Sequence, residues 1–244
     1  MSAQQKRFTQ PEKGMLATYR DLMVGDGGYG ALALFELYSL LFTNLPGLPG
    51  YAARRITLPW IVRRALRPTV GKGVTIRTPN RITLGRGVIL DDYSVLDVRI
   101  EDPADVKDVG IEIGDHVLVG RSSLIVAKNA KIQLGNACNI SSNCRIATQS
   151  RVEIGESVLI AAYAYIGPGN HAIDDSSTPM IEQAMDNRGG VKIGNHAWIG
   201  TRATILDGVS IGANAIVGAH SLVRENVPEG AIVAGTPAKI LKYR

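Results

Sequence analysis

His171 is the side chain in this sequence that is best placed for acid–base chemistry. The other three histidines each follow an aliphatic residue, a glycine and one short residue, in a pattern that recurs along the chain: His116, His196 and His220. His171 stands where that pattern stops, directly after Asn170 and shortly before Asp174 and Asp175. Because an unperturbed imidazole titrates near neutral pH, a histidine at the root of a loop can act as a general base.

The spacing of the same residues argues against metal or cysteine chemistry. A three-histidine zinc site gathers its ligands around one ion and includes a closely spaced pair, whereas these histidines are far apart in the chain. Cys138 and Cys144 both fill a small-residue corner position of the repeat, with no basic partner for catalysis in the local pattern. We therefore expect no metal ion and no covalent cysteine intermediate.

A six-residue repeat predicts the secondary structure that carries these side chains. It is clearest between Val191 and Ala238, where a β-branched residue recurs at every sixth position: Ile193, Ile199, Ile205, Ile211, Val217 and Val223. This period matches neither a helix face nor strand alternation, so the repeat is a structural unit in its own right. One aliphatic and one small residue per unit favour a short strand and a tight corner. Three units close a triangular coil, and stacked coils form a mainly β, parallel β-helix.

The repeat divides the chain into two parts. Residues 70–244 carry hexads and are predicted to form the β-helix domain with a short C-terminal tail, whereas residues 1–69 carry none. The hexads stop twice, at 97–110 and at about 172–190. A long loop that leaves a regular coil is more often functional than accidental, so the second interruption, which follows His171, is the candidate site.

The segment 1–69 leaves two interpretations open. Ala31–Phe42 is apolar and predicts a helix, which is shorter than the roughly twenty residues needed to cross a bilayer. Two prolines and two glycines in 44–50 are predicted to stop any helix. The apolar and arginine-rich character of 31–67 suits peripheral contact with a membrane interface. It equally suits a cap on the first coil or an oligomer contact.

The charge distribution bears on partners and location. Residues 1–69 hold nine Lys and Arg against four Asp and Glu, and the remaining residues hold eighteen of each. The basic excess therefore lies outside the repeat, which argues against nucleic acid as a partner. The first twenty residues lack the apolar core of a signal peptide. We expect a cytoplasmic protein, with peripheral contact to the cytoplasmic face of the inner membrane as the open alternative.

Several motifs resemble those of the hexapeptide-repeat acetyltransferases of the galactoside, maltose and nodulation-factor type. They are Asn170-His171, VKIGNHAWIG at 191–200, LDGVSIG at 206–212, VGAHS at 217–221 and AGTPAK at 234–239. The resemblance covers most of 70–244. It implies a left-handed parallel β-helix, a homotrimer with active sites between subunits, and acetyl-CoA as co-substrate.

The resemblance also implies roles for individual residues. His171 matches the family's catalytic base, and Thr201 and Ala219 would line the pantetheine arm through backbone groups. The nucleotide phosphates would meet basic side chains of the last coils: Arg224, Lys239 and Lys242. Cationic side chains suit the several negative charges of the coenzyme. Weaker candidates for acceptor binding are Asn170, Asp174 and Asp175. His220 replaces the family's usual glycine.

The function implied is an acetyl-CoA-dependent O-acetyltransferase that acts on a sugar hydroxyl in cell-envelope polysaccharide or glycolipid biosynthesis. Transfer would be direct, with His171 removing the acceptor proton. Two alternatives within the acyltransferase class remain, N-acetylation of an amino sugar and transfer from acyl carrier protein. A non-catalytic β-helix scaffold at the membrane is the alternative of another class. Binding of coenzyme A would separate the enzymes from the scaffold.

Overall fold

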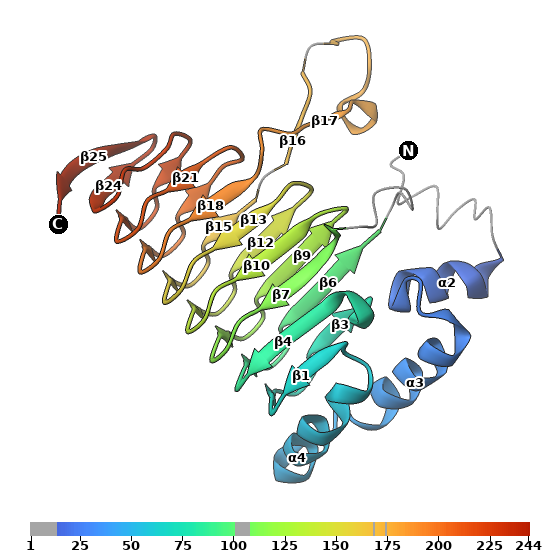
Figure 1. Cartoon of the computed structure of the whole chain (residues 1–244). Helices are drawn as coiled ribbons and strands as arrows, with labels where there is room; N and C mark the ends of the chain where they lie inside the picture. The colour runs from blue at the N-terminus through green and yellow to red at the C-terminus, as the bar shows by residue number, and fades with distance from the viewer. Residues whose placement is uncertain (1–13, 101–107, 168, 174) are drawn as a thin grey trace.

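The body of the protein is a left-handed parallel β-helix with three faces, as the hexads predict (Figure 1). The computed structural model describes residues 14–100, 108–167, 169–173 and 175–244. Each coil contributes one strand to each face in turn, and every coil pairs in parallel with the next, so that Ile132 lies opposite Val152 and Ile140 opposite Ile160.

The strands of the three faces follow in chain order. Sheet A contains β1 (Arg64–Leu66), β4 (Ile82–Arg86), β7 (Gly110–Ile113), β10 (Lys131–Leu134), β13 (Val152–Ile154), β18 (Val191–Ile193) and β21 (Ser210–Ile211). Sheet B contains β2 (Thr69–Val70), β5 (Ile89–Leu90), β8 (Leu118–Val119), β11 (Asn139–Ile140), β14 (Leu159–Ile160), β19 (Trp198–Ile199), β22 (Ile216–Val217), β24 (Ala231–Gly235) and β25 (Ala238–Tyr243). Sheet C contains β3 (Thr75–Arg77), β6 (Val95–Arg99), β9 (Leu124–Lys128), β12 (Arg145–Thr148), β15 (Tyr165–Ile166), β20 (Thr204–Ile205) and β23 (Leu222–Val223).

The aliphatic residue of each hexad fills the interior. Ile140, Ile160 and Ile199 form one such column on sheet B and are fully buried. Branched side chains suit short, flat strands because they pack well against the same residue in the coil above and below. The small residue of each hexad, such as Ala197 or Ala215, is also buried and lets the chain turn closely around the core.

Tight corners join sheet A to sheet B and sheet B to sheet C. Many of these corners hold a non-glycine residue in the left-handed conformation, among them His116 (φ 58°), His196 (φ 59°) and His220 (φ 58°). All three side chains are exposed, as the repeat predicts. The corners from sheet C to sheet A are less regular, and both long interruptions of the repeat fall between a strand of sheet C and the next strand of sheet A.

The N-terminal segment forms helices that cover the first coil (Figure 1). They are α2 (Met15–Val24), α3 (Gly28–Leu41), α4 (Gly47–Thr57) and the 3₁₀ turn η1 (Leu58–Trp60). Tyr38, Leu58 and Val62 belong to the same buried cluster as the interior of the solenoid. The buried Arg54 donates hydrogen bonds to the carbonyls of Val70, Phe42 and Leu45, which ties α4 to the first coil. The capping interpretation of this segment therefore describes the structure.

Helix α3 ends at Leu41, before the glycines and prolines of 44–50, as predicted. The break is shorter than expected, because a new helix begins at Gly47 and tolerates Pro49 in its first turn, where the missing N–H has no helical partner. The solenoid also begins before Val70, since β1 at Arg64–Leu66 already pairs in parallel with β4. Its sequence, Arg-Ala-Leu, contains no hexad. Among the described residues, no helix combines the length and apolar character that a bilayer crossing needs.

The two interruptions differ in what the structure describes. Strand β6 continues to Arg99 and β7 begins at Gly110, so the first interruption is shorter than predicted, and most of it, 101–107, lies outside the described residues. The second leaves after β15 and returns at β18. It carries a two-stranded hairpin, β16 (Asn170–His171) with β17 (Met185–Asp186), and the 3₁₀ turn η4 (Met180–Glu182). This external loop projects from the solenoid in Figure 1.

Candidate active site

The external loop holds His171 in a defined orientation. His171 pairs with Met185 across the hairpin, and its imidazole Nδ1 lies 3.3 Å from the carbonyl oxygen of Gln183. A carbonyl oxygen can only accept a hydrogen bond, so in a neutral imidazole this contact favours the tautomer with the proton on Nδ1 and the lone pair on Nε2. The side chain is exposed. Nε2 then lies on the side of the ring away from the Gln183 carbonyl, as the predicted general-base role requires.

Asp175 forms hydrogen bonds with other residues of the external loop. Its carboxylate accepts hydrogen bonds from the backbone N–H and hydroxyl of Ser177 and from the hydroxyl of Thr178. These bonds to the charged form lower the pKa of Asp175 to about 2. Gln183 Nε2 donates to the carbonyls of Asp175 and Thr178, at 2.7 and 3.0 Å. Asp175 thus stabilises the turn next to Gln183, whose carbonyl orients His171.

The other two acceptor candidates are less fully described. Asn170 pairs with Asp186 through the β16–β17 hairpin. Asp174 lies outside the described residues. Acceptor binding by Asn170, Asp174 and Asp175 stays a prediction.

Asp207 anchors the return of the external loop and was missed in the sequence. It is buried, and its carboxylate accepts from the backbone N–H groups of Arg188 and Gly190, each at 2.7 Å, and of Gly208 at 2.9 Å. Asp207 holds the second place after the repeat residue Ile205, as Asp115 and Asn195 do after Ile113 and Ile193, so its position in the hexad did not distinguish it. Gln183 lies in the irregular loop, where the repeat gives no signal either.

Thr201 and Ala219 lie in successive corners between sheets B and C. The backbone N–H of His220 donates to the carbonyl of Thr201 at 2.8 Å, which stacks one corner directly on the other. A Cβ on Gly200 would lie only 2.6 Å from the Ala219 nitrogen, so the backbones are as close as they can be. Both predicted coenzyme residues are exposed and have small side chains, and we call the stretch of corner backbone that they form the coenzyme strip.

The predicted basic residues do not form one cluster. Lys239 and Lys242 lie on β25, opposite Ala234 and Ile232 of β24, on the outward face of sheet B. The turn before β25 packs on the same B–C corner as Ala219, because Thr236 Oγ1 donates to the carbonyl of His220 at 3.2 Å. Arg224 instead follows β23 at the C–A corner, with Nε 3.8 Å from Glu225.

A single chain therefore separates the predicted catalytic base from the predicted coenzyme strip. His171 leaves the solenoid at the C–A edge, whereas Thr201, Ala219 and the start of β25 lie at the B–C edge. Sheet C lies between the two edges. Arg224 shares the edge of the external loop.

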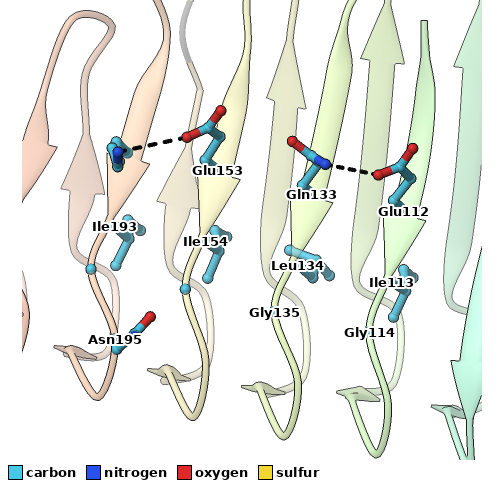
Figure 2. Close-up of a pocket in the computed structure, with 13 residues that line it drawn as sticks. Glu112, Ile113, Gly114, Gln133, Leu134, Gly135, Glu153, Ile154, Ile193 and Asn195 are labelled. Carbon is cyan, nitrogen blue, oxygen red and sulfur yellow. Dashed lines mark hydrogen bonds and ion pairs between the residues drawn. The ribbon is translucent and has the colours of Figure 1, made fainter. Parts of the chain in front are cut away.

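A depression on sheet A offers no comparable chemistry (Figure 2). Figure 2 shows Glu112, Gln133 and Glu153 in a row across neighbouring strands. Gln133 Nε2 donates to Glu112 at 2.8 Å, and Lys192 lies 3.9 Å from Glu153. The polar groups pair with one another, as on a solvated sheet face, and His171 is not among the lining residues.

The two cysteines are poorly suited to act as nucleophiles. Burial raises the pKa of the Cys138 and Cys144 thiols, which disfavours the nucleophilic thiolate form. Both are free and buried. Within the described part of the chain, no three His, Cys, Asp or Glu side chains gather as they would around a metal ion.

Comparisons with known proteins agree with the fold. The family model described as bacterial transferase hexapeptide (six repeats) matches residues 190–225. A probable acetyltransferase of Mycobacterium tuberculosis is 32% identical over 203 residues, which cover 83% of this chain and 64% of that protein. Nodulation protein L of Rhizobium meliloti is 41% identical over 110 residues, 45% of this chain and 58% of that protein. The chain thus covers less than two thirds of each relative.

Among solved structures, an N-acyltransferase of Bacillus cereus in complex with dTDP-4-amino-4,6-dideoxyglucose and coenzyme A is similar in fold. The TM-score is 0.53 at 19% identity, and the match covers 84% of this chain and 91% of that chain. At this identity the likeness concerns the fold alone.

Proposed function

We propose that this chain, which is similar to the bacterial hexapeptide-repeat transferases, is an acetyl-CoA-dependent O-acetyltransferase that acts on a sugar hydroxyl. The observation that carries the proposal is the contact between His171 Nδ1 and the Gln183 carbonyl, which leaves Nε2 as the base. Relatives named as acetyltransferases support the choice of acetyl group.

The reaction is a direct transfer between two bound substrates. His171 Nε2 removes the proton from the acceptor hydroxyl as that oxygen attacks the thioester carbonyl carbon of acetyl-CoA. The tetrahedral intermediate collapses with cleavage of the C–S bond. The imidazolium then returns its proton to the departing coenzyme A thiolate. The products are the O-acetylated sugar and coenzyme A, and the histidine is restored.

The active site forms between subunits of a homotrimer in this proposal. The separation of His171 from Thr201 and Ala219 by sheet C supports it, since one chain alone leaves each half of the site exposed. When the C–A edge of one subunit faces the B–C edge of the next, the base meets the coenzyme strip. Such a heterologous contact closes a ring after three copies and creates three equivalent sites.

The coenzyme lies along the B–C edge in this arrangement. The small side chains of Thr201 and Ala219 leave room for the pantetheine arm, and Lys239 and Lys242 meet the phosphates beyond it. The acceptor is a hydroxyl of a cell-envelope polysaccharide or of its lipid-linked precursor, which enters beside the external loop.

The test is titration of the full chain with coenzyme A in a calorimeter, followed by acetyl-CoA turnover with hydroxyl and amino sugars. We expect binding, and acetylation at oxygen that falls sharply in His171→Ala while coenzyme binding is kept. No binding at millimolar coenzyme would favour the scaffold alternative. Acetylation confined to amino sugars would replace the hydroxyl acceptor by an amine.

A further inference from the structure

The helices at the end of the solenoid farthest from the C-terminus expose several large apolar side chains. Helices α3 and α4 lie beyond the first coil there (Figure 1). Leu40 and Leu48 are 82% and 80% exposed, and Ile56 and Trp60 are 65% and 53% exposed. We call these four side chains, with the arginines described next, the basal face. Monomeric proteins rarely expose apolar side chains in such numbers on neighbouring elements unless something binds them.

Arginines accompany the apolar side chains. Arg55 lies on α4, and three more lie in and beside β1 of the first coil: Arg63, Arg64 and Arg67. All four are exposed, and within the described residues none of them forms an ion pair with a carboxylate. Between residues 28 and 67 the only acidic residue is Glu36, which accepts a hydrogen bond from Tyr19 at 2.7 Å. The basal face therefore carries uncompensated positive charge.

The inner sides of the same helices are already used. Leu32, Phe35 and Tyr38 of α3 are buried, as are Gly50, Arg54 and Thr57 of α4. Trp60 stands edge-on to Phe42, with ring centroids 6.3 Å apart, and so joins the end of α3 to the end of α4. The exposed leucines thus belong to the outer sides of a fixed cap. They are not residues of a core that has yet to close.

We propose that the basal face docks the protein on an anionic lipid bilayer. Leucine, isoleucine and tryptophan side chains would enter the boundary between headgroups and acyl chains, while the arginines meet lipid phosphates. A protein partner would need carboxylates matched to four separate arginines, whereas a bilayer of anionic lipid supplies negative charge at every position. Docking by the cap leaves the solenoid upright on the membrane, with the external loop along its side.

The test is vesicle flotation with the full chain. Vesicles of phosphatidylcholine with phosphatidylglycerol are compared with vesicles of phosphatidylcholine alone, at low and high salt. We expect binding to the anionic vesicles, weakened by salt because charges at the surface are screened. The double variant Leu40→Gln/Leu48→Gln should bind at least about tenfold more weakly than the parent. The triple variant Arg63→Gln/Arg64→Gln/Arg67→Gln should lose roughly fivefold per arginine.

Matched controls come from other exposed sites. Leu241 is 65% exposed near the opposite end of the chain, and the Arg121 side chain is 61% exposed at a B–C corner. Leu241→Gln and Arg121→Gln should bind vesicles like the parent. Circular dichroism should be unchanged in all variants, and coenzyme A binding should be unchanged in the basal-face variants, which separates lost docking from lost folding and from failure of the proposed enzyme activity.

A second measurement reports the depth of Trp60. In a Trp198→Phe background Trp60 is the sole tryptophan, and its fluorescence should shift to the blue and be quenched by brominated acyl chains. The proposal is overturned if the protein stays unbound with anionic vesicles, if it binds neutral vesicles equally well, or if the basal-face variants bind no more weakly than the two controls.

Discussion

The chain turns at both edges of sheet C, by tight and uniform corners at one edge and by connections of varying length at the other. At the B–C edge each coil turns through a tight corner, and corners such as those of Thr201 and Ala219 stack directly, linked by a 2.8 Å backbone hydrogen bond. At the C–A edge the chain varies in length from coil to coil, and it leaves the solenoid altogether between β15 and β18. The regular edge offers a continuous row of stacked corners, and the irregular edge offers a projecting side chain.

This difference indicates how a repetitive fold can position a single reactive side chain. A uniform stack of corners can hold an extended ligand but cannot place one reactive group, because every coil presents the same backbone. An insertion places one group, and it then needs contacts of its own, here from Gln183 to His171 and from Asp207 to the loop backbone. The proposed enzyme joins an edge of each kind across a subunit boundary.

Removing the reactive group from the irregular edge should have the largest effect. We expect His171→Ala to lower kcat by about 10²–10⁴, because general-base catalysis is lost while the coenzyme strip is untouched. Steady-state kinetics with saturating acetyl-CoA measure this. His196→Asn is the matched control, since it removes an exposed histidine from a regular corner and asparagine tolerates the left-handed conformation. Near-normal turnover of His171→Ala would place the base elsewhere.

A side chain added to the regular edge should block it. Ala219→Leu should raise KM for acetyl-CoA about tenfold or more with little change in stability, because the residue is exposed and its bulk enters the pantetheine strip. Ala213→Leu is the control, since Ala213 holds the equivalent position beside Gly194 at an A–B corner. An equal effect of both variants on KM would mean that the B–C corner is not the coenzyme site.

Loosening the root of the external loop should cost stability as well as rate. Asp207→Ala leaves the N–H groups of Arg188 and Gly190 without their acceptor, at about 1–3 kcal/mol. A fall in Tm of roughly 2–10 °C follows for a chain of this size, measured by calorimetry. Asp115→Ala removes a comparable bond to the Arg86 N–H at an exposed corner and should change Tm little. Cleavage of the external loop by protease should rise only in Asp207→Ala.

Charge at the end of the regular edge should give the smallest effect. Lys239→Ala and Lys242→Ala should each raise KM for acetyl-CoA about twofold to fivefold, because exposed charge pairs are weak. The difference in KM between variant and parent should be smaller at high salt, because salt also screens the attraction between the lysines and the phosphates in the parent. Arg224 lies on the irregular edge, so a raised KM for acetyl-CoA in Arg224→Ala would indicate that this edge of the neighbouring subunit reaches the nucleotide. KM values unchanged in all three variants would remove these residues from the coenzyme site.

Much of this organisation follows from the hexads alone. The repeat places Ile193, Ile199 and Ile205 in the interior and His196 and His220 at outward corners, and the structure agrees. The start of the solenoid could not be found in this way, because β1 pairs with β4 through backbone groups and its sequence lacks the period. The helix at Gly47 was missed for a related reason, since its stability comes from Arg54 and from packing on the first coil.

The solenoid, its corners and the place where the repeat gives way to His171 follow from the amino-acid sequence, because a six-residue pattern is local and recurs in every coil. How His171 is held depends on tertiary contacts, since the Gln183 carbonyl lies against the imidazole and the Asp207 carboxylate accepts from backbone N–H groups, and no periodic signal marks either contact. Tertiary structure also decided that base and coenzyme strip occupy opposite edges of sheet C, because their relative position depends on how the coils stack.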